Sequence, residues 1–400
     1  MMAEKIQLTS SSMKKWKRLN GLMPSIPDDV IFYEIFPRLP VKSLHRFRCI
    51  ATSFHGLIYK KRFLDVVRLY APRRQLITFP QLLPEEIDLY HAEFTNCPYG
   101  PGLIRATAME DPFINRCIYI TVINGFLCRA NESRNVVIMN NATKEVSLLP
   151  NYEPPFGCKR HYVYFVYDPH TDIYKVLRTM PFRTGTGETT PLLRYSIFTL
   201  GYEKWVCFDY PGLLQYGNSK SVCIDGILYL NNFREGCGRH VMGIFSVQND
   251  SFSTMLYPNG LDRLKYDDCH LIELNGSLAI IDVGFVLSDG ITLWRKQKGS
   301  KLDDGASWVE QTIKFPVEWL RANRLCARYY FSNNLNGEIV MGKTSILTGN
   351  NCCILIYNMD NETWREFTVL DVVNHVIFGD FRLDEYVETS LLLSQISRPR

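Results

Sequence analysis

Residues 124–150, NGFLCRANESRNVVIMNNATKEVSLLP, contain two hairpin signals within one short stretch. Asn124-Gly125 fits the positive φ angles of a two-residue hairpin turn, and a short apolar run stands on each side of it. Further on, Met139 and Val146 are seven residues apart across a polar turn, which predicts a second hairpin with these side chains facing each other. Two successive hairpins indicate a four-stranded antiparallel sheet.

Both signals recur along the rest of the chain. An Asn-Gly or Asp-Gly dipeptide between apolar runs occurs at 124–125, 225–226, 275–276 and 336–337. Apolar, mostly aromatic pairs stand seven apart at Met139/Val146, Tyr167/Tyr174, Phe198/Trp205, Phe245/Phe252 and Tyr357/Trp364. The unit that begins at the third of these turns, 275–276, has a longer loop, 294–308, in place of a seven-spaced pair. The glycine turns lie 101, 50 and 61 residues apart, and the first interval fits two units because it holds two of the seven-spaced hairpins.

Four-stranded repeats of this length are typical of β-propellers, because one blade cannot bury both of its faces alone. We therefore expect residues 71–400 to form a large all-β domain, an irregular propeller-like fold of five or six mostly four-stranded sheets. Residues 377–393 are expected to pair near the domain's N-terminal strand and so close the ring. A large β-sandwich stays open as the alternative, since spacing alone does not exclude it.

The N-terminal part has a different period. Over residues 22–70 the apolar residues recur three or four apart, which predicts several short helices. Pro27, followed by two acids, suits a first helical turn, whereas Pro37 and Pro40 predict that the first helix ends just before Pro40, where the next begins. Residues 1–21 are expected to be a disordered basic tail.

Two sets of motifs resemble a known family. Residues 24–58, PSIPDDVIFYEIFPRLPVKSLHRFRCIATSFHGLI, resemble the F-box of plant F-box proteins, above all in RLPVKSLHRFRCI at 38–50. Downstream, 124–150, FVYDPHTDIYKVLR at 165–178 and SIFTLGYEKWVCF at 196–208 resemble the F-box-associated interaction domain. The segment PPFGCKRHY is similar to the S-locus F-box subgroup, although related defence and hormone-pathway receptors share much of this pattern.

The resemblance implies the substrate-recognition subunit of a Skp-cullin-F-box ubiquitin ligase. In that family the F-box packs on a Skp-family adaptor, which bridges to a cullin and its RING partner, while the C-terminal domain holds the target protein. The implied role is therefore that of a non-catalytic receptor. Thr52 and Phe54 replace a frequent lysine and a frequent tryptophan of the pattern, and Pro37 stands where a small polar residue is common, so adaptor affinity could be reduced.

The residues carried over as adaptor-facing share an apolar or proline side chain on the short helices. They are Ile26, Pro27, Val30, Ile31, Ile35, Leu39, Pro40, Val41, Leu44, Phe47, Cys49 and Ile50. An apolar patch of this kind needs a partner to cover it. For any single member the alternative is a place in the internal core of the helices.

Composition narrows the remaining classes of function. The net charge of +4 comes from 45 basic and 41 acidic residues, too small a surplus to indicate nucleic-acid binding. There is no secretory signal pattern and no run of 18 apolar residues, so we expect no membrane and a cytoplasmic or nuclear protein. The twelve cysteines show no C-x-x-C and no zinc-ligand spacing, so reduced thiols and no metal are expected.

Catalytic motifs are absent from the sequence. It has no Walker-type loop, H-E-x-x-H, G-x-S-x-G or dinucleotide fingerprint, so no catalytic residue and no cofactor are predicted. Two alternatives stay open: an interaction scaffold independent of ubiquitin, and a β-propeller hydrolase such as a glycosidase. The hydrolase would need paired carboxyl groups in one pocket, one with a raised pKa. Only the ligase receptor explains residues 24–58.

The site that binds the target protein is the least determined part of the prediction. Partners of propellers usually contact loops, because the strands are occupied in the core. The long polar connections are 153–161, 183–190, 234–240 and 296–307, and these are the candidate target-binding loops. An ordinary surface connection is the alternative for each of them.

Overall fold

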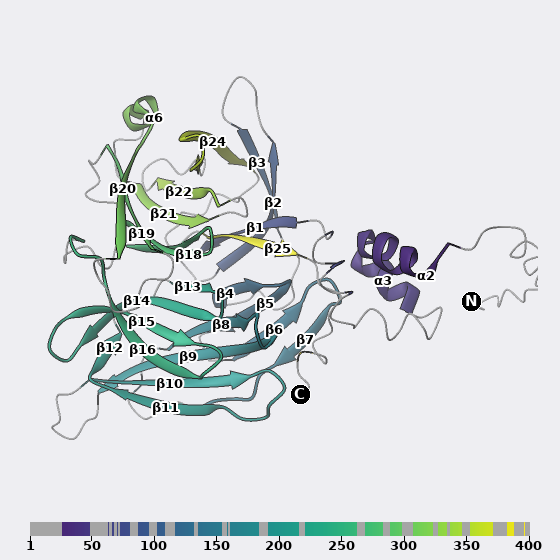
Figure 1. The fold of residues 1–400 in the computed structure, drawn as a ribbon, viewed down its shortest axis with the longest axis horizontal. Helices are drawn as coiled ribbons and strands as arrows, with labels where there is room; N and C mark the ends of the chain where they lie inside the picture. The colour runs from purple at the N-terminus through teal and green to yellow at the C-terminus, as the bar shows by residue number, and fades with distance from the viewer. Residues whose placement is uncertain are drawn as a thin grey trace, which may run out of the picture. The chain divides into compact units, whose positions relative to one another are not determined.

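The computed structural model describes residues 26–48, 63, 66–67, 70, 73–80, 87–95, 102–108, 117–131, 135–153, 158, 161–183, 191–215, 221–261, 269–282, 289–297, 307–322, 327–333, 337–345, 353–370, 382–387 and 396 (Figure 1). The chain divides into two compact units, Met1–Pro72 and Arg73–Arg400. The first is helical and the second is built almost entirely of β-strands.

The first unit contains the short helices α2 (Asp28–Val30), η1 (Ile31–Ile35), η2 (Phe36–Arg38) and α3 (Val41–Arg48). The helical run stops before Pro40 and a new helix follows it, as predicted. The run is not one regular α-helix, however, because η1 is a π-helical turn and η2 a 3-10 turn. Pro37 has no N–H to donate to the carbonyl of Tyr33, and the Phe36 N–H donates to the Ile31 carbonyl instead.

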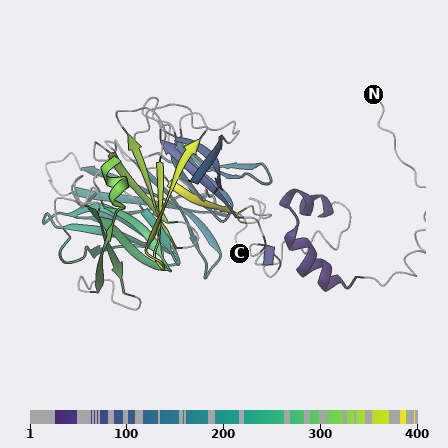
Figure 2. The ribbon, with the colours of Figure 1, turned by 90° about the horizontal axis from the view of Figure 1, so that it is seen from above.

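The second unit contains 25 described strands in five hydrogen-bonded sheets, with one short helix, α6 (Val317–Ala322), after β20. Figure 1 shows α6 at the edge of this unit, and Figure 2, turned by 90°, shows it as a green helix in front of the strands. Three of the sheets are simple antiparallel blades of four strands. They are β4 (Cys117–Ile123), β5 (Phe126–Asn131), β6 (Val136–Asn140) and β7 (Glu145–Leu148); β8 (Tyr162–Asp168), β9 (Ile173–Arg183), β10 (Pro191–Thr199) and β11 (Val206–Pro211); and β17 (His270–Leu274), β18 (Ser277–Asp282), β19 (Gly290–Lys296) and β20 (Trp308–Lys314).

Two sheets depart from the four-stranded rule. One has five strands, β12 (Leu213–Gln215), β13 (Ser221–Ile224), β14 (Ile227–Glu235), β15 (His240–Ser246) and β16 (Ser251–Leu256). The other has eight, β21 (Ala327–Asn333), β22 (Ile339–Ser345), β23 (Cys353–Asn358), β24 (Thr363–Leu370), β1 (Arg73–Pro80), β2 (Ile87–Thr95), β3 (Gly102–Ala108) and β25 (Arg382–Val387). In it two four-stranded groups join through the parallel pair of β24 and β3.

The last described strand closes the ring. β25 pairs antiparallel with β1, so a C-terminal strand and the first strands of the unit lie in one sheet. This confirms the pairing expected for residues 377–393. The described strands thus form a β-propeller with a circular closure, and the sandwich alternative is wrong.

The hairpin signals are where the sequence predicted them. Asn124, Asp225 and Asn275 have φ angles of 50°, 48° and 51°. The glycine after each of them also has a positive φ angle, as the tight turn requires. The seven-spaced pairs Met139/Val146, Tyr167/Tyr174, Phe245/Phe252 and Tyr357/Trp364 are partners in the strand register. The rings of Phe198 and Trp205 lie 5.3 Å apart, and the longer loop connects the paired Lys296 and Trp308.

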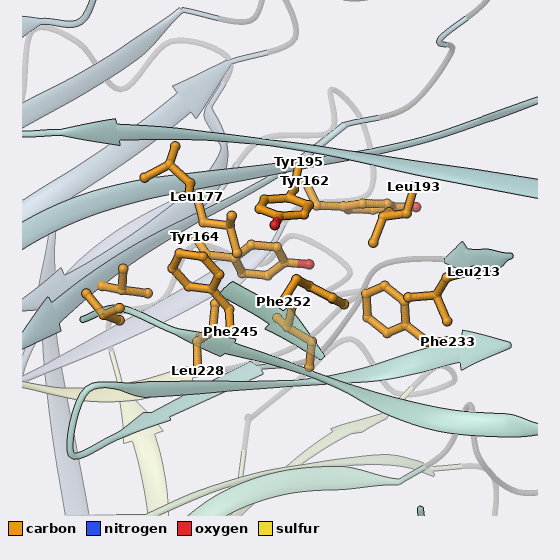
Figure 3. Packing of buried hydrophobic residues seen from close by; sticks show 14 of the residues in the cluster. Tyr162, Tyr164, Leu177, Leu193, Tyr195, Leu213, Leu228, Phe233, Phe245 and Phe252 are labelled. Carbon is orange, nitrogen blue, oxygen red and sulfur yellow. The ribbon is translucent and has the colours of Figure 1, made fainter. Parts of the chain in front are cut away.

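Neighbouring blades share their cores. Figure 3 shows Tyr162, Tyr164, Leu177, Leu193 and Tyr195 of the β8–β11 blade facing Leu213, Leu228, Phe233, Phe245 and Phe252 of the β12–β16 blade. Successive residues of a strand point to opposite faces, so Leu228 and Leu230 pack here while Tyr229 between them packs toward the β17–β20 blade. Burial on both faces explains why these strands are continuous apolar runs instead of alternating ones.

Within the described residues, no helix is both long and apolar enough to cross a membrane.

Candidate functional site

The predicted adaptor-facing residues separate into an exposed group and a buried group. Ile26 is 54% exposed, and Val30 and Ile35 are each 40% exposed, which is unusual for large aliphatic side chains. Pro27 and Pro40 are exposed as well. These five residues are called the exposed F-box set, and they lie in or beside α2, η1 and α3.

The other described members of the predicted set contribute to the interior of the helical unit. Val41 is 3% exposed and Leu44 is fully buried, in a cluster with Phe36, Phe63 and Val67. Ile31, Leu39 and Phe47 are partly buried and pack against that cluster. For Val41 and Leu44 the internal-core alternative therefore holds. Cys49 and Ile50 lie outside the described residues.

The second candidate site is a cavity among the innermost strands of the propeller. β4, β8, β17, β21 and β25 are edge strands of their sheets, and contacts such as β4 with β8 and β17 with β21 place these strands side by side. A cavity of about 380 Å³ is lined by residues of β4, β8, β13, β17 and β21. It also includes the turn residues Pro169, Asp225 and Gly226, and so reaches the face of the propeller that carries the Asn-Gly and Asp-Gly turns. This cavity is called the central cavity.

The turns at this face interlock from one blade to the next. A Cβ on Gly226 would lie 2.9 Å from a carboxylate oxygen of Asp168 in the neighbouring blade. A Cβ on Gly337 would lie 2.8 Å from the side-chain oxygen of Asn275. Both glycines also have positive φ angles, so any other residue would be strained and crowded. The glycine of the turn signal thus serves blade packing as well as the hairpin.

Burial controls the ionisation of two groups in the cavity wall. The pKa of Glu273 is raised, chiefly because burial disfavours its charged form, and a hydrogen bond from the backbone of Gly276 opposes the shift. Burial also raises the pKa of the Cys223 thiol to about 11, and the carboxylates of Glu273 and Asp168 add to the rise. Cys223 is therefore a protonated thiol at neutral pH, which argues against a nucleophilic role.

The rim of the central cavity carries further polar contacts. Nε2 of His170 lies 3.3 Å from Oδ1 of Asp225, and both side chains are largely exposed. The hydroxyl of Tyr167 donates to Oδ1 of Asp172 at 2.9 Å. On the wall, Nδ1 of His270 accepts a hydrogen bond from the backbone N–H of Phe331 at 3.4 Å. No group of three or more His, Cys, Asp or Glu within the described ranges is placed to hold a metal ion.

Of the four candidate target-binding loops, only 234–240 is described in full, and it is shorter than predicted. Arg234 and Glu235 belong to β14 and His240 to β15, so the connection is a tight turn. Nε of Arg234 donates to the Gly238 carbonyl at 3.0 Å, and Nε of Arg239 donates to Glu235 at 2.9 Å. Its polar groups are thus used within the turn. Most of 153–161, 183–190 and 296–307 lies outside the described residues.

Sequence reasoning missed the residues of the central cavity, although a signal for them was present. In the blades of β4, β13 and β17 the innermost strand ends at an Asn-Gly or Asp-Gly turn. Residues 121–123 directly precede Asn124, whereas one residue separates 221–223 from Asp225 and 270–273 from Asn275, and all of these ranges line the cavity. The strand residues before these three turns would therefore have identified part of the wall, but not the part that β8 contributes.

Comparison with known proteins agrees with this architecture. Residues 104–389 match the family model described as the F-box associated beta propeller domain. A putative F-box protein of Arabidopsis thaliana is 26% identical over 302 residues, which cover 72% of each chain. An F-box protein of the same plant is 24% identical over 366 residues, covering 88% of this chain and 87% of the relative.

Among solved structures, a fungal lectin from Aleuria aurantia with a six-bladed β-propeller fold is similar at 7% identity and a TM-score of 0.41. The match covers 74% of this chain and 95% of the lectin. The family match extends over most of the propeller unit, and the curated relatives extend toward the helical one. The chain belongs to the plant F-box proteins that carry an F-box-associated β-propeller domain.

Proposed function

We propose that this protein is the target-binding subunit of a Skp-cullin-F-box ubiquitin ligase. The helical unit docks a Skp-family adaptor, and through it a cullin and its RING partner, while the propeller holds a protein to be ubiquitinated. The observation that carries the proposal is the pairing, in one chain, of a helical unit with exposed apolar residues and a propeller of the F-box-associated family. The chain itself performs no catalysis in this proposal, and it acts in the cytoplasm or the nucleus.

The exposed F-box set supplies the docking surface. Large aliphatic side chains at 40% exposure or more cost free energy in water, and a partner that covers them recovers it. The buried residues Val41 and Leu44 act indirectly, because they hold the helices that present the exposed side chains. Substitutions in the two groups therefore separate docking from folding.

The test is co-purification of the full chain with a Skp-family adaptor. Val30→Asp and Ile35→Asp place a charge in the docking surface and are expected to weaken adaptor binding at least about tenfold, with helical circular dichroism unchanged. Lys42→Ala, an exposed polar position on α3, is the matched control and should bind normally. Leu44→Asp instead reports on folding, because that side chain is buried. Normal adaptor binding by both charged variants would refute this docking surface.

The scaffold alternative predicts a different result for the intact protein. A scaffold independent of ubiquitin would fail to recruit the adaptor at all, even with the wild-type helical unit. Recruitment of target proteins is tested by proximity labelling under proteasome inhibition, with the intact chain beside a version that lacks residues 1–72. The receptor role is supported by target proteins that both versions bind, but whose abundance rises under proteasome inhibition only in cells that contain the intact chain.

A hydrolase is a second candidate, because two carboxyl groups line one cavity. Glu273 and Asp225 come from neighbouring blades, and burial raises the pKa of Glu273, which meets the first requirement of a carboxyl-pair glycosidase. Asp225 instead lies at the exposed rim, with its Oδ1 3.3 Å from Nε2 of His170. Turnover of aryl glycosides by the wild type, lost in Glu273→Gln, would support the hydrolase. No turnover by either removes it.

A further inference from the structure

The central cavity is large enough to hold a ligand and is built from several blades at once. Its volume of about 380 Å³ lies in the lower part of the range of about 300–1,000 Å³ that small-ligand sites occupy. Its walls come from the innermost strands, which the interlocked turns hold in place. Such a wall is rigid, so whatever enters the cavity meets a preformed set of contacts.

The charged groups of this wall are acidic. Glu273 lies on β17 and Asp225 at the turn after β13, and no Lys or Arg occurs among the described residues that line the cavity. His270 lies on the same strand as Glu273, and its Nδ1 accepts a hydrogen bond from the backbone N–H of Phe331. The negative charges of Glu273 and Asp168 both add to the raised pKa of the Cys223 thiol, which belongs to the same wall. The cavity therefore favours a cation.

The uncharged part of the wall suits the same ligand. Three aromatic residues, Tyr164, Tyr167 and Phe331, belong to the lining, although Tyr164 and Phe331 also pack in the blade cores. Aromatic faces attract ammonium and guanidinium groups, and they also pack against the methylene stems that carry these groups in lysine and arginine. An anion would meet two carboxyl groups, and a purely apolar ligand would desolvate Glu273 further without supplying a counter-charge.

We propose that the central cavity receives a lysine or arginine side chain of the target protein, with the carboxylates of Glu273 and Asp225 as its counter-charges. This inference rests on the proposed function, since it names the chemistry by which the propeller would recognise its target. Glu273 is the inner partner because it is half-buried, and Asp225 is the outer one at the rim. When a cation enters and pairs with this half-buried carboxylate, the attraction between the two charges offsets part of the hydration that each of them loses.

The test uses short glycine-serine peptides that differ at one central position, with binding to the full chain followed by protein-observed NMR. Peptides with arginine or lysine are expected to bind at least about tenfold more tightly than peptides with citrulline or norleucine, which keep the length but remove the charge. Comparing arginine with lysine shows which cation the cavity prefers. Equal binding of the charged and neutral peptides, or no binding at about 10 mM, would overturn the proposal.

Substitutions in the protein connect this preference to the cavity. Glu273→Gln keeps the shape of the side chain and is expected to reduce binding of the arginine peptide about tenfold, with an unchanged melting temperature. Glu203→Gln, an exposed carboxyl outside the cavity, is the matched control and should leave binding unchanged. If Glu273→Gln binds the arginine peptide as the wild type does, the carboxylate role is wrong.

Adaptor co-purification with the same variants separates this inference from the proposed function. Glu273→Gln is expected to bind the Skp-family adaptor normally, since the residue belongs to the propeller unit. A wild-type chain that binds the adaptor but shows no charge preference contradicts the inference alone. A chain that prefers the charged peptides but does not bind the adaptor contradicts the receptor role alone.

Discussion

The two units of this chain differ in how their buried residues are connected. In the helical unit the described core is one cluster around four buried side chains, Phe36, Leu44, Phe63 and Val67. In the propeller the cores of the blades from β8 to β24 are continuous, because alternate residues of one strand belong to two clusters. Within the described residues, the buried side chains of the helical unit thus form a single cluster, whereas those of the propeller are distributed over several.

This difference has a functional side. The helical unit presents the exposed F-box set, so a partner that covers that set would stabilise this unit. The propeller, whose blade cores are continuous, can instead present a preformed cavity. Three substitutions and one double-mutant cycle test the contrast, from the largest expected change in the free energy of unfolding to the smallest.

Phe245→Ala should have the largest effect. Phe245 is fully buried between two blades, opposite Phe252 in the strand register, with its ring 6.3 Å from that of Tyr195 in the neighbouring blade. Removing a buried phenylalanine ring costs about 3–5 kcal/mol, and urea denaturation followed by tryptophan fluorescence would measure the loss. Tyr202→Ala, at a position 59% exposed, is the control. A loss below about 1 kcal/mol would mean that the blade cores do not interlock as described.

Leu44→Ala should cost about 3 kcal/mol, but within the helical unit. Because Leu44 is fully buried in the described cluster of that unit, we expect this variant to lose helical circular dichroism at room temperature while the propeller's melting temperature stays unchanged. Val30→Ala, on the exposed side, is the matched control and should keep the helical signal. A parallel drop in the stability of the propeller would show that the two units fold as one.

The architecture of the propeller could be predicted because its signals are local. An Asn-Gly turn needs two positive φ angles, and Asn124 with Gly125 adopts them whatever lies around the hairpin. A pair seven residues apart across a tight turn, such as Tyr357 and Trp364, is brought face to face by the strand register alone. The six-residue α6 was missed because it is too short to show a helical period.

The site was less predictable because it depends on relations between elements. In the helical unit the π-helical turn η1 and the 3-10 turn η2 change the rotation per residue, so a regular helical period misplaces faces. Leu44 and Val30 were both carried over from the family resemblance, which does not distinguish buried from exposed members, although Leu44 is fully buried and Val30 is exposed. In the propeller, Glu273 and Asp225 are 48 residues apart in sequence, and only the ring of blades places both on one cavity.

Lys175→Met tests whether polar contacts also join the blades. Nζ of Lys175 is buried and donates to the Val247 carbonyl at 2.7 Å and to Asp250 in the next blade. Methionine keeps most of the aliphatic stem but leaves the carbonyl without this donor, which costs about 1–3 kcal/mol. Thermal unfolding measures the change, and Lys204→Met at an exposed position is the control. No difference between these two variants would mean that the apolar clusters alone hold the blades together.

The smallest effect belongs to the ion pair of Arg194 and Asp209 on β10 and the outer strand β11. The guanidinium donates to both carboxylate oxygens, at 2.6 and 2.7 Å, and this hydrogen bonding lowers the pKa of Asp209. Since the side chains are 30% and 41% exposed, water and salt screen the pair, and a double-mutant cycle with alanine should give only about 0.2–1 kcal/mol.

The pH dependence of that coupling follows from the sign of the shift. A carboxyl whose folded pKa is lowered contributes its stability fully above the ordinary aspartate value of about 4, and loses it as the pH falls through the lowered value. The coupling energy should therefore be the same at neutral pH and at pH about 5, and should shrink on further acidification. Because the pair is polar and exposed, added salt should also reduce it, whereas the loss caused by Phe245→Ala should not weaken with salt. A coupling that persists in both acid and high salt would mean that the outer strand is held by an interaction other than this ion pair.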